Sequence, residues 1–158
     1  MTEVPRFDAR VAVYDAWPPL YESLFELTLV VHRSGLEPKL LQLVQIRTSQ
    51  LNGCTYCLDL HVGFAKRAGE ADHRLHTVAA WRDADWFTDA EKAALALTEA
   101  VAVLGSGGPS DAIVDEVRRH FADDGLAKLL LVIASITAWN LVNVTAKIRI
   151  GGDAPPSS

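Results

Sequence analysis

The two cysteines of the chain, Cys54 and Cys57, are separated by two residues, and His61 follows the second cysteine by four. At about 100° per residue, a helix starting near Asn52 places both thiols and the imidazole on one narrow face. Asn52 is a good N-cap residue, so Cys54 should lie in the first helical turn, where the helix dipole favours a thiolate. The spacing predicts a redox centre that cycles between a dithiol and a disulfide.

The imidazole of His61 would lie one helical turn after Cys57, where it can accept the thiol proton or pair with the thiolate. A thiolate that attacks a hydroperoxide becomes a sulfenic acid, with which a neighbouring cysteine condenses to a disulfide. Cys57 could attack first because a base lies near it, and Cys54 could attack first because of the helix dipole. Both orders stay open at this point.

Other uses of a close cysteine pair fit the sequence less well. A structural zinc site needs four ligands, and His73 and His76 lie too close together in sequence for a zinc-finger histidine pair. Attachment of c-type haem requires a histidine directly after the second cysteine, where this chain has Leu58. Two buried and inert cysteines are the structural alternative. We expect no metal and no cofactor.

The remaining histidines and tryptophans have structural interpretations. His32 and His120 fall near the expected C-termini of helices, where the dipole favours an imidazolium. Trp81, Trp86 and Trp139 are expected to anchor the core or an interface.

Length and charge limit the class of protein. A chain of 158 residues fits one domain, and its net charge of −5 with scattered Lys and Arg favours neither nucleic acid nor an anionic membrane as partner. The first residues lack the basic and apolar regions of a secretory signal, so we expect a cytoplasmic protein. In the cytosol, a close thiol pair is more often catalytic or redox-sensing than structural.

Hydrophobic periodicity predicts an all-α, single-domain, multi-helix fold over residues 1–150, followed by a disordered tail at 151–158. After a loop with a short helical turn at 1–17, the expected helices cover residues 18–35, 38–52, about 53–68, 71–82, 89–104, 111–121 and 126–148. The best-marked start is a capping box formed by Thr88 and Glu91.

Three of these helices carry further expectations. The first should face the core with Leu20, Leu24, Leu27 and Val31. Gly63 inside the cysteine helix costs helix propensity, which predicts close packing of another element there. The last helix is apolar on all sides and should lie at the domain centre or in a subunit interface. Its polar interruptions, Ser135, Thr137, Asn140 and Asn143, argue against a membrane span.

The segment from Gly35 to Gly69, with Asn52-Gly53-Cys54-Thr55-Tyr56-Cys57 and His61, resembles the AhpD-like alkylhydroperoxidases of the carboxymuconolactone decarboxylase family. Residues 79–82, 87–91 and 137–140 are similar to the same family, so the resemblance covers most of residues 14–148. It implies a helical homo-oligomer, often a trimer or hexamer, with thiol-dependent peroxidase or disulfide reductase activity in antioxidant defence. The substrate would be a small hydroperoxide and the reductant a dithiol or a thioredoxin-like protein.

In that family, a glutamate twelve residues before the first cysteine joins the histidine and the second cysteine in a proton relay. Gln42 occupies this position here. A glutamine can orient His61 but cannot accept its proton as a carboxylate does. The relay therefore lacks its base unless another carboxylate, such as Asp59 or Glu26, reaches the pocket. The candidate catalytic residues are therefore Cys54, Cys57, His61 and Gln42.

Two further functions compete with the peroxidase. The first is a redox-sensing helical oligomer whose peroxidase activity was lost with the carboxylate. The second is a cofactor-free decarboxylase or isomerase acting on a small organic acid, although true carboxymuconolactone decarboxylases lack the paired cysteines.

Overall fold

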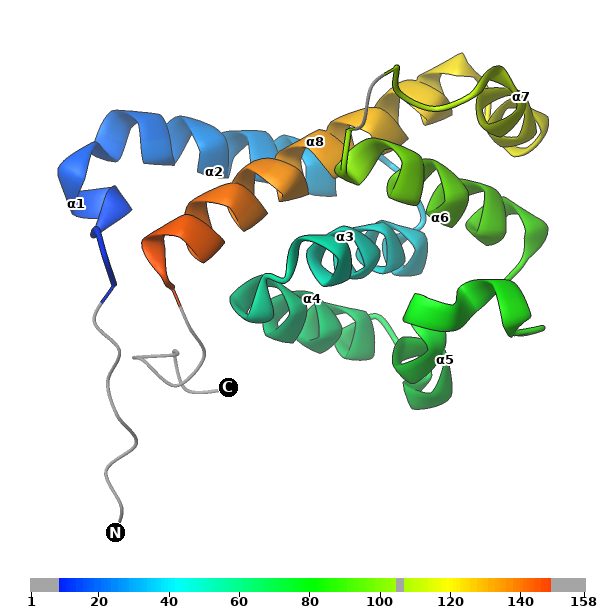
Figure 1. Ribbon diagram of the computed structural model, residues 1–158, viewed down its shortest axis with the longest axis horizontal. Helices are drawn as coiled ribbons and strands as arrows, with labels where there is room; N and C mark the ends of the chain where they lie inside the picture. The colour runs from blue at the N-terminus through cyan, green and yellow to red at the C-terminus, as the bar shows by residue number, and fades with distance from the viewer. Residues whose placement is uncertain (1–8, 105–106, 149–158) are drawn as a thin grey trace, which may run out of the picture.

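The computed structural model describes residues 9–104 and 107–148, and every regular element in these two ranges is a helix (Figure 1). The elements are α1 (Val13–Ala16), α2 (Pro18–His32), α3 (Pro38–Asn52), α4 (Thr55–Arg67), α5 (Asp72–Thr77), the 3-10 turn η1 (Val78–Asp83), α6 (Asp89–Ala102), α7 (Asp111–His120) and α8 (Asp123–Ala146). The predicted all-α fold is confirmed. The expected tail at 151–158 lies outside the described residues.

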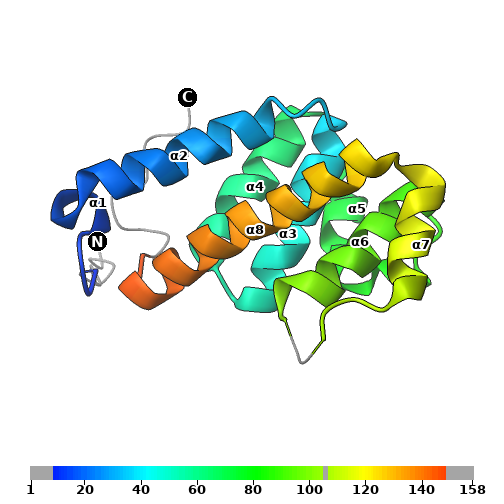
Figure 2. The same ribbon diagram turned by 90° about the horizontal axis from the view of Figure 1, so that it is seen from above.

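Helix α3 is the centre of the domain. It packs against α4, α6 and α8, and Leu43, Val44 and Ile46 are almost wholly buried. Its first turn begins with Pro38, and the Glu37 side chain accepts a hydrogen bond from the backbone N of Leu40 at 2.7 Å. Figure 2 shows α8 crossing over α3. The apolar band of α3 is therefore sandwiched between neighbouring helices.

Helix α8 is long and apolar enough, by length and composition, to cross a membrane, and it is the one such helix among the described residues. In this domain it packs against α2, α3, α4, α6 and α7 and buries one side, including Leu129 and Ile133. Its other side exposes Leu131 and Leu141. The buried side supports a core helix. The exposed apolar side fits the expected homo-oligomer, which stays a prediction.

The inward face of α2 matches the predicted one only in part. Val31 is buried and Leu24 is half-buried, but Leu20 and Leu27 are exposed. Tyr21 and Thr28 turn toward α8 instead. There the Tyr21 ring packs edge-on against Trp139, and the Trp139 Nε1 donates a hydrogen bond to Thr28 Oγ1 at 2.7 Å. The prediction considered aliphatic residues alone, and aromatic and hydroxyl contacts with α8 set the rotation of α2 instead.

The turn between α3 and α4 also differs from the prediction. Asn52 is the last residue of α3 and not the N-cap of α4, because Gly53 takes the left-handed conformation (φ 68°) that ends a helix. Cys54 is the N-cap of α4, and its Sγ accepts a hydrogen bond from the backbone N of Cys57 at 3.3 Å. The cysteine itself therefore does the capping expected of the asparagine.

Smaller expectations had mixed outcomes. The capping box of Thr88 and Glu91 is confirmed. The helix expected over 71–82 divides into α5 and η1, with Ala80 non-helical inside η1. Trp81 is a core residue as predicted, but Trp86 is half exposed and stands against the His73 ring.

The close approach expected at Gly63 is absent from the described part of the chain. A methyl group at this position would touch Arg67 Nη1 at 3.6 Å and nothing else within 4 Å. The propensity cost of this glycine therefore has no packing explanation there.

Replacing Gly53 with alanine should lower the free energy of unfolding by about 1–2 kcal/mol, because alanine is strained at positive φ. No steric clash would contribute, since no neighbouring atom lies within 4 Å of the new methyl group. Gly63→Ala is the matched control and should be neutral or stabilise by up to about 1 kcal/mol. Urea denaturation measures both variants, and equal effects would contradict the left-handed turn.

Candidate active site

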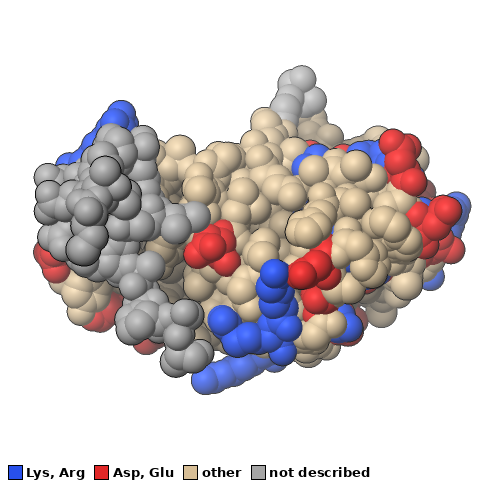
Figure 3. Space-filling model, turned by 90° about the horizontal axis from the view of Figure 1, so that it is seen from below, with Lys and Arg blue, Asp and Glu red and all other residues tan. Residues whose placement is uncertain are grey.

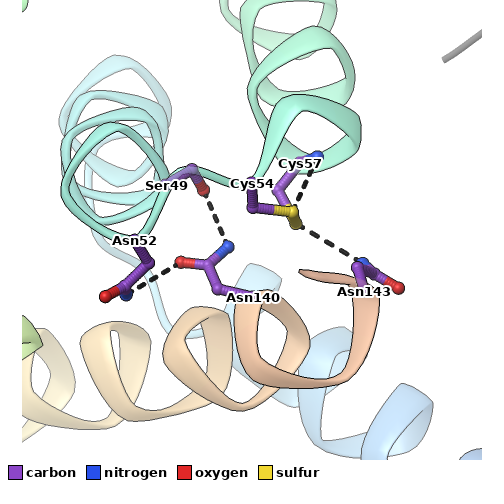
Figure 4. The surroundings of a disulfide bond; sticks show 6 residues. All are labelled: Ser49, Asn52, Cys54, Cys57, Asn140 and Asn143. Atoms are coloured by element: carbon purple, nitrogen blue, oxygen red, sulfur yellow. Dashed lines mark hydrogen bonds between the residues drawn. A yellow bond between two sulfur atoms is a disulfide. The ribbon is translucent and has the colours of Figure 1, made fainter. Parts of the chain in front are cut away.

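The two cysteines form a disulfide across the start of α4 (Figure 4). Their Cα atoms are 5.3 Å apart, and both residues are at most 2% exposed. They pack in a small apolar cluster with Ile136 of α8, which Tyr56 and Trp139 border. The pair is thus held between α4 and the C-terminal half of α8.

Two asparagines of α8 join the helix to this region, and Figure 4 shows both. Asn143 Nδ2 donates a hydrogen bond to Cys57 Sγ at 3.4 Å. Asn140 donates to Ser49 Oγ at 3.1 Å and accepts from Asn52 Nδ2 at 3.2 Å. In the sequence, these asparagines argued only against a membrane span. Buried amides three residues apart on an otherwise apolar helix were the signal that they have polar partners.

Gln42 of α3 and His61 of α4 are both buried and lie against each other. The distance from His61 Nδ1 to Gln42 Oε1 is 2.9 Å. An amide oxygen can only accept, so this contact assigns the hydrogen to Nδ1 and leaves Nε2 as the proton acceptor. The predicted orienting contact between these two residues is present.

Burial, and secondarily the neighbouring His32, lowers the pKa of His61 from 6.5 to about 4. The imidazole is therefore neutral at pH 7. Burial also lowers the pKa of His32, which makes the expected imidazolium cap on α2 unfavourable. His120 does lie in the last turn of α7, where it contacts Glu116.

A pocket of about 660 Å³ lies between α1, α2, α3, α4 and the C-terminal half of α8. Cys57, His61, Gln42 and Asn143 border it together, whereas Cys54 does not. The rest of its wall is mainly aliphatic and aromatic, including Tyr14, Tyr21, Phe25, Tyr56, Phe64 and Trp139. The structure therefore brings three of the four predicted site residues to one cavity and places the fourth directly behind them.

The carboxylate expected from elsewhere in the chain does not reach this pocket. Asp59 and Glu26 are exposed, and neither borders the cavity. No aspartate or glutamate lines the cavity among residues 9–104 and 107–148. Within the same ranges, no group of three or more His, Cys, Asp or Glu side chains could hold a metal ion. Asp59 and Glu26, the substitutes that the sequence left open, therefore do not complete the relay.

The domain is all-helical and carries a buried Cys-x-x-Cys disulfide, followed by a histidine at one edge of an apolar pocket. These features place the protein among helical dithiol proteins. A family model described as the carboxymuconolactone decarboxylase family matches residues 12–100. The chain belongs to this family, and the resemblance noted in the sequence is confirmed.

Two curated relatives match most of the chain. The uncharacterized protein YdfG of Bacillus subtilis (strain 168) is 30% identical over 135 residues, which cover 85% of this chain and 92% of that protein. The uncharacterized protein YnjA of Escherichia coli (strain K12) is 32% identical over 134 residues, covering 84% of this chain and 69% of that one.

Solved structures share the fold. A protein of unknown function from Agrobacterium tumefaciens, provisionally assigned to antioxidant defence as AhpD, is 28% identical with a TM-score of 0.87, covering 90% of this chain and 97% of that one. The debrominase Bmp8, solved in complex with 2,3,4-tribromopyrrole, has a TM-score of 0.78 at 19% identity, covering 85% of this chain and 72% of its own. At that identity the second likeness concerns the fold alone.

The lowered pKa of His61 makes the protein less stable in acid. Between pH 6.5 and about 4 the unfolded chain binds a proton at His61 that the folded chain does not, so stability falls as the pH falls through this window. Acidification from pH 7 to 5 should cost about 2 kcal/mol through this residue. His61→Gln should remove that component from urea denaturation curves, and His76→Gln, at an exposed position, should retain it. An unchanged pH dependence in His61→Gln would refute a buried neutral imidazole.

Proposed function

We propose that the protein is a thiol-dependent peroxidase that reduces organic hydroperoxides with its Cys54–Cys57 pair. The observation that carries this proposal is that Cys57, disulfide-bonded to Cys54, borders the same pocket as His61. A hydroperoxide that enters the pocket meets the sulfur of Cys57 beside an imidazole with a free Nε2. Membership of the family and the likeness to the A. tumefaciens protein support an antioxidant role.

The proposed cycle starts from the reduced pair. His61 takes the proton of the Cys57 thiol, and the thiolate attacks the terminal oxygen of the hydroperoxide. The O–O bond breaks, Cys57 becomes a sulfenic acid, and the leaving alkoxide takes the proton to become an alcohol. The Cys54 thiol then attacks the sulfenic sulfur, which forms the disulfide and releases water. An external dithiol returns two electrons and two protons.

Two hydrogen-bond donors support the division of roles between the cysteines. Asn143 donates to the Cys57 sulfur and can stabilise its thiolate. The backbone N of Cys57 donates to the Cys54 sulfur at the start of α4, where the helix dipole also favours negative charge. Cys54 is therefore suited to leave as a thiolate when a reductant attacks Cys57.

The same proposal includes the expected partners. A dithiol or a thioredoxin-like protein would reduce the disulfide, in the cytoplasm, and the protein would act as a homo-oligomer. Large exposed apolar side chains on both long helices, such as Val30 of α2 and Leu141 of α8, support association with further copies. Sedimentation velocity checks the subunit number.

Cys57→Ser should abolish consumption of cumene hydroperoxide in the presence of dithiothreitol. Without dithiothreitol, the reduced Cys54→Ser variant should consume one equivalent and then stop, because the sulfenic acid on Cys57 has no resolving thiol. Trapping with dimedone and mass spectrometry should place the label on Cys57. The label on Cys54 in Cys57→Ser would reverse the two roles. Multiple turnover of cumene hydroperoxide by a variant without either cysteine would refute the thiol-dependent peroxidase. The decarboxylase-like alternative predicts activity on a small organic acid that survives the loss of both cysteines.

The second candidate is a redox sensor with little peroxidase activity, and Gln42 is the observation that favours it. A glutamine behind His61 cannot stabilise the imidazolium that forms when Cys57 loses its proton. The low pKa of His61 has the same consequence, since it makes the imidazole a weak base.

Gln42→Glu discriminates between these candidates. A carboxylate beside Nδ1 should raise the pKa of His61 and increase the rate of reaction with cumene hydroperoxide by roughly tenfold. Gln42→Leu, which has neither charge nor acceptor, should lower the rate and serves as the matched control. If the protein is a peroxidase, the wild-type rate should lie well above that of Cys57→Ser. A wild-type rate equal to that of Cys57→Ser, rescued by Gln42→Glu, would establish the sensor instead.

A further inference from the structure

The pocket beside Cys57 is much larger than a small peroxide requires. Its volume of about 660 Å³ falls in the range of cavities that hold drug-sized molecules. Phe25, Leu29 and Leu60 border the cavity and are themselves partly exposed, so they form its mouth, while Cys57 and His61 are buried. A ligand that fills the pocket would therefore extend from the solvent to the sulfur.

One wall of this pocket is built from aromatic rings in contact. The Tyr21 ring stands edge-on to Tyr14 and to Trp139, with centroids 5.2 Å apart in both pairs. The Phe64 ring lies near His61, with a centroid distance of 5.9 Å. Such rings bind a further aromatic or bulky apolar group by edge-to-face and offset contacts.

Most of the polar side chains that line the pocket fall into two sets: tyrosines on its wall, Tyr14, Tyr21 and Tyr56, and buried residues near Cys57. Trp139 Nε1 donates to Thr28 Oγ1, and Thr28 Oγ1 donates in turn to the backbone O of Leu24 at 3.1 Å, so these groups have partners within the protein. The side chains of Gln42, His61 and Asn143 are buried and line the pocket with Cys57, whose sulfur accepts from Asn143. A reactive polar group that points toward the sulfur meets these side chains, while the apolar body of the ligand lies against the aromatic wall.

The pocket offers no fixed charge to an ionic ligand. Among the described residues that line it, none is Lys, Arg, Asp or Glu. Burial lowers the pKa values of His61 and His32, so both are neutral at pH 7, and burial next to Tyr56 and Tyr14 raises the pKa of Tyr21. Figure 3 shows a mostly uncharged face of the molecule with charged residues in small separate clusters. A carboxylate in the pocket would lose its hydration without a counter-charge.

We infer that this pocket selects uncharged hydroperoxides with a bulky apolar, preferably aromatic, body, and discriminates against hydrogen peroxide and against molecules that carry a carboxylate. The inference rests on the proposed peroxidase function for its reaction, but the binding preference does not depend on it. It also separates the site from one that acts on small organic acids.

Binding to the oxidised wild-type protein tests the preference without any reaction. Isothermal titration calorimetry compares 2-phenyl-2-propanol, the neutral product of cumene hydroperoxide, with 2-methyl-2-phenylpropanoate, a carboxylate of similar shape. The neutral probe should bind at least about tenfold more tightly. Equal affinities, tighter binding of the carboxylate, or no binding of the neutral probe would overturn the inference. Arg149 lies outside the described residues, so carboxylate binding that Arg149→Ala abolishes would overturn it as well.

A matched pair of variants on α2 locates the binding site. Leu29 and Leu27 are 40% and 39% exposed, but only Leu29 lines the pocket. Leu29→Trp should fill the mouth and weaken the neutral probe by about tenfold or more, and Leu27→Trp should leave its affinity unchanged. Equal effects of the two variants would place the probe elsewhere and refute the pocket.

Kinetics separates failure of this inference from failure of the proposed function. The kcat/KM for cumene hydroperoxide should exceed that for hydrogen peroxide by more than about tenfold. This ratio should fall in Leu29→Trp and stay unchanged in Leu27→Trp. Turnover of both peroxides at similar rates would leave the peroxidase standing and overturn the selectivity. Tight, pocket-dependent binding of 2-phenyl-2-propanol without dithiol-dependent turnover would overturn the peroxidase and retain the pocket's preference for neutral apolar molecules.

Discussion

The left-handed backbone at Gly53 is the constraint on which the site depends. It ends α3 and lets the backbone N of Cys54 donate to the Ser49 carbonyl at 3.0 Å, which folds α4 back against α3. Asn140 of α8 then forms hydrogen bonds with the side chains of Ser49 and Asn52, in the last turn of α3. The positions of both sulfurs, and the wall that α8 supplies beside them, therefore follow from the geometry of a single turn.

A glutamine at position 42 suits the burial of the site. The residue is 4% exposed and His61 is 5% exposed. A glutamate in this place would be a buried charge unless His61 were protonated or the carboxyl itself took up a proton. A glutamine keeps the hydrogen bond to Nδ1 and keeps the pair neutral, so the tautomer of His61 is held without the cost of burying a charge. The consequence is a weaker base, which makes proton removal from Cys57 the demanding step of the proposed cycle.

The sequence was informative where the signals are local. The spacing of Cys54, Cys57 and His61, and the position of Gln42 relative to them, identified residues that the structure places together. The capping box located the start of its helix correctly because it depends on a few neighbouring residues. The error at Asn52 came from two competing local signals, since the preference of Gly53 for positive φ outweighed the capping preference of the asparagine.

The pocket could not be predicted in the same way, because it is formed by contacts distant in sequence. Its outer wall depends on the rotation of α2, which the contacts of Tyr21 and Thr28 with Trp139 determine across more than a hundred residues. The donor to Cys57, Asn143, comes from α8, whose apolar composition indicated burial but not which side faces the cysteines. Periodicity indicates that a helix has an apolar face, whereas the exact rotation of the helix and the residues that it meets depend on the three-dimensional packing.

The unequal surroundings of the two sulfurs give the proposed cycle its order. The pocket reaches Cys57 and not Cys54, so both a hydroperoxide and a small external dithiol would approach the same atom through the same cavity. Attack on the disulfide at Cys57 releases Cys54 at the start of α4, where a backbone N–H already points at its sulfur. The oxidised and reduced forms would thus differ in which substrate they accept and not in where it binds. Because one cavity cannot hold both substrates at the reacting sulfur, oxidation and reduction must alternate, with each product leaving before the next substrate binds.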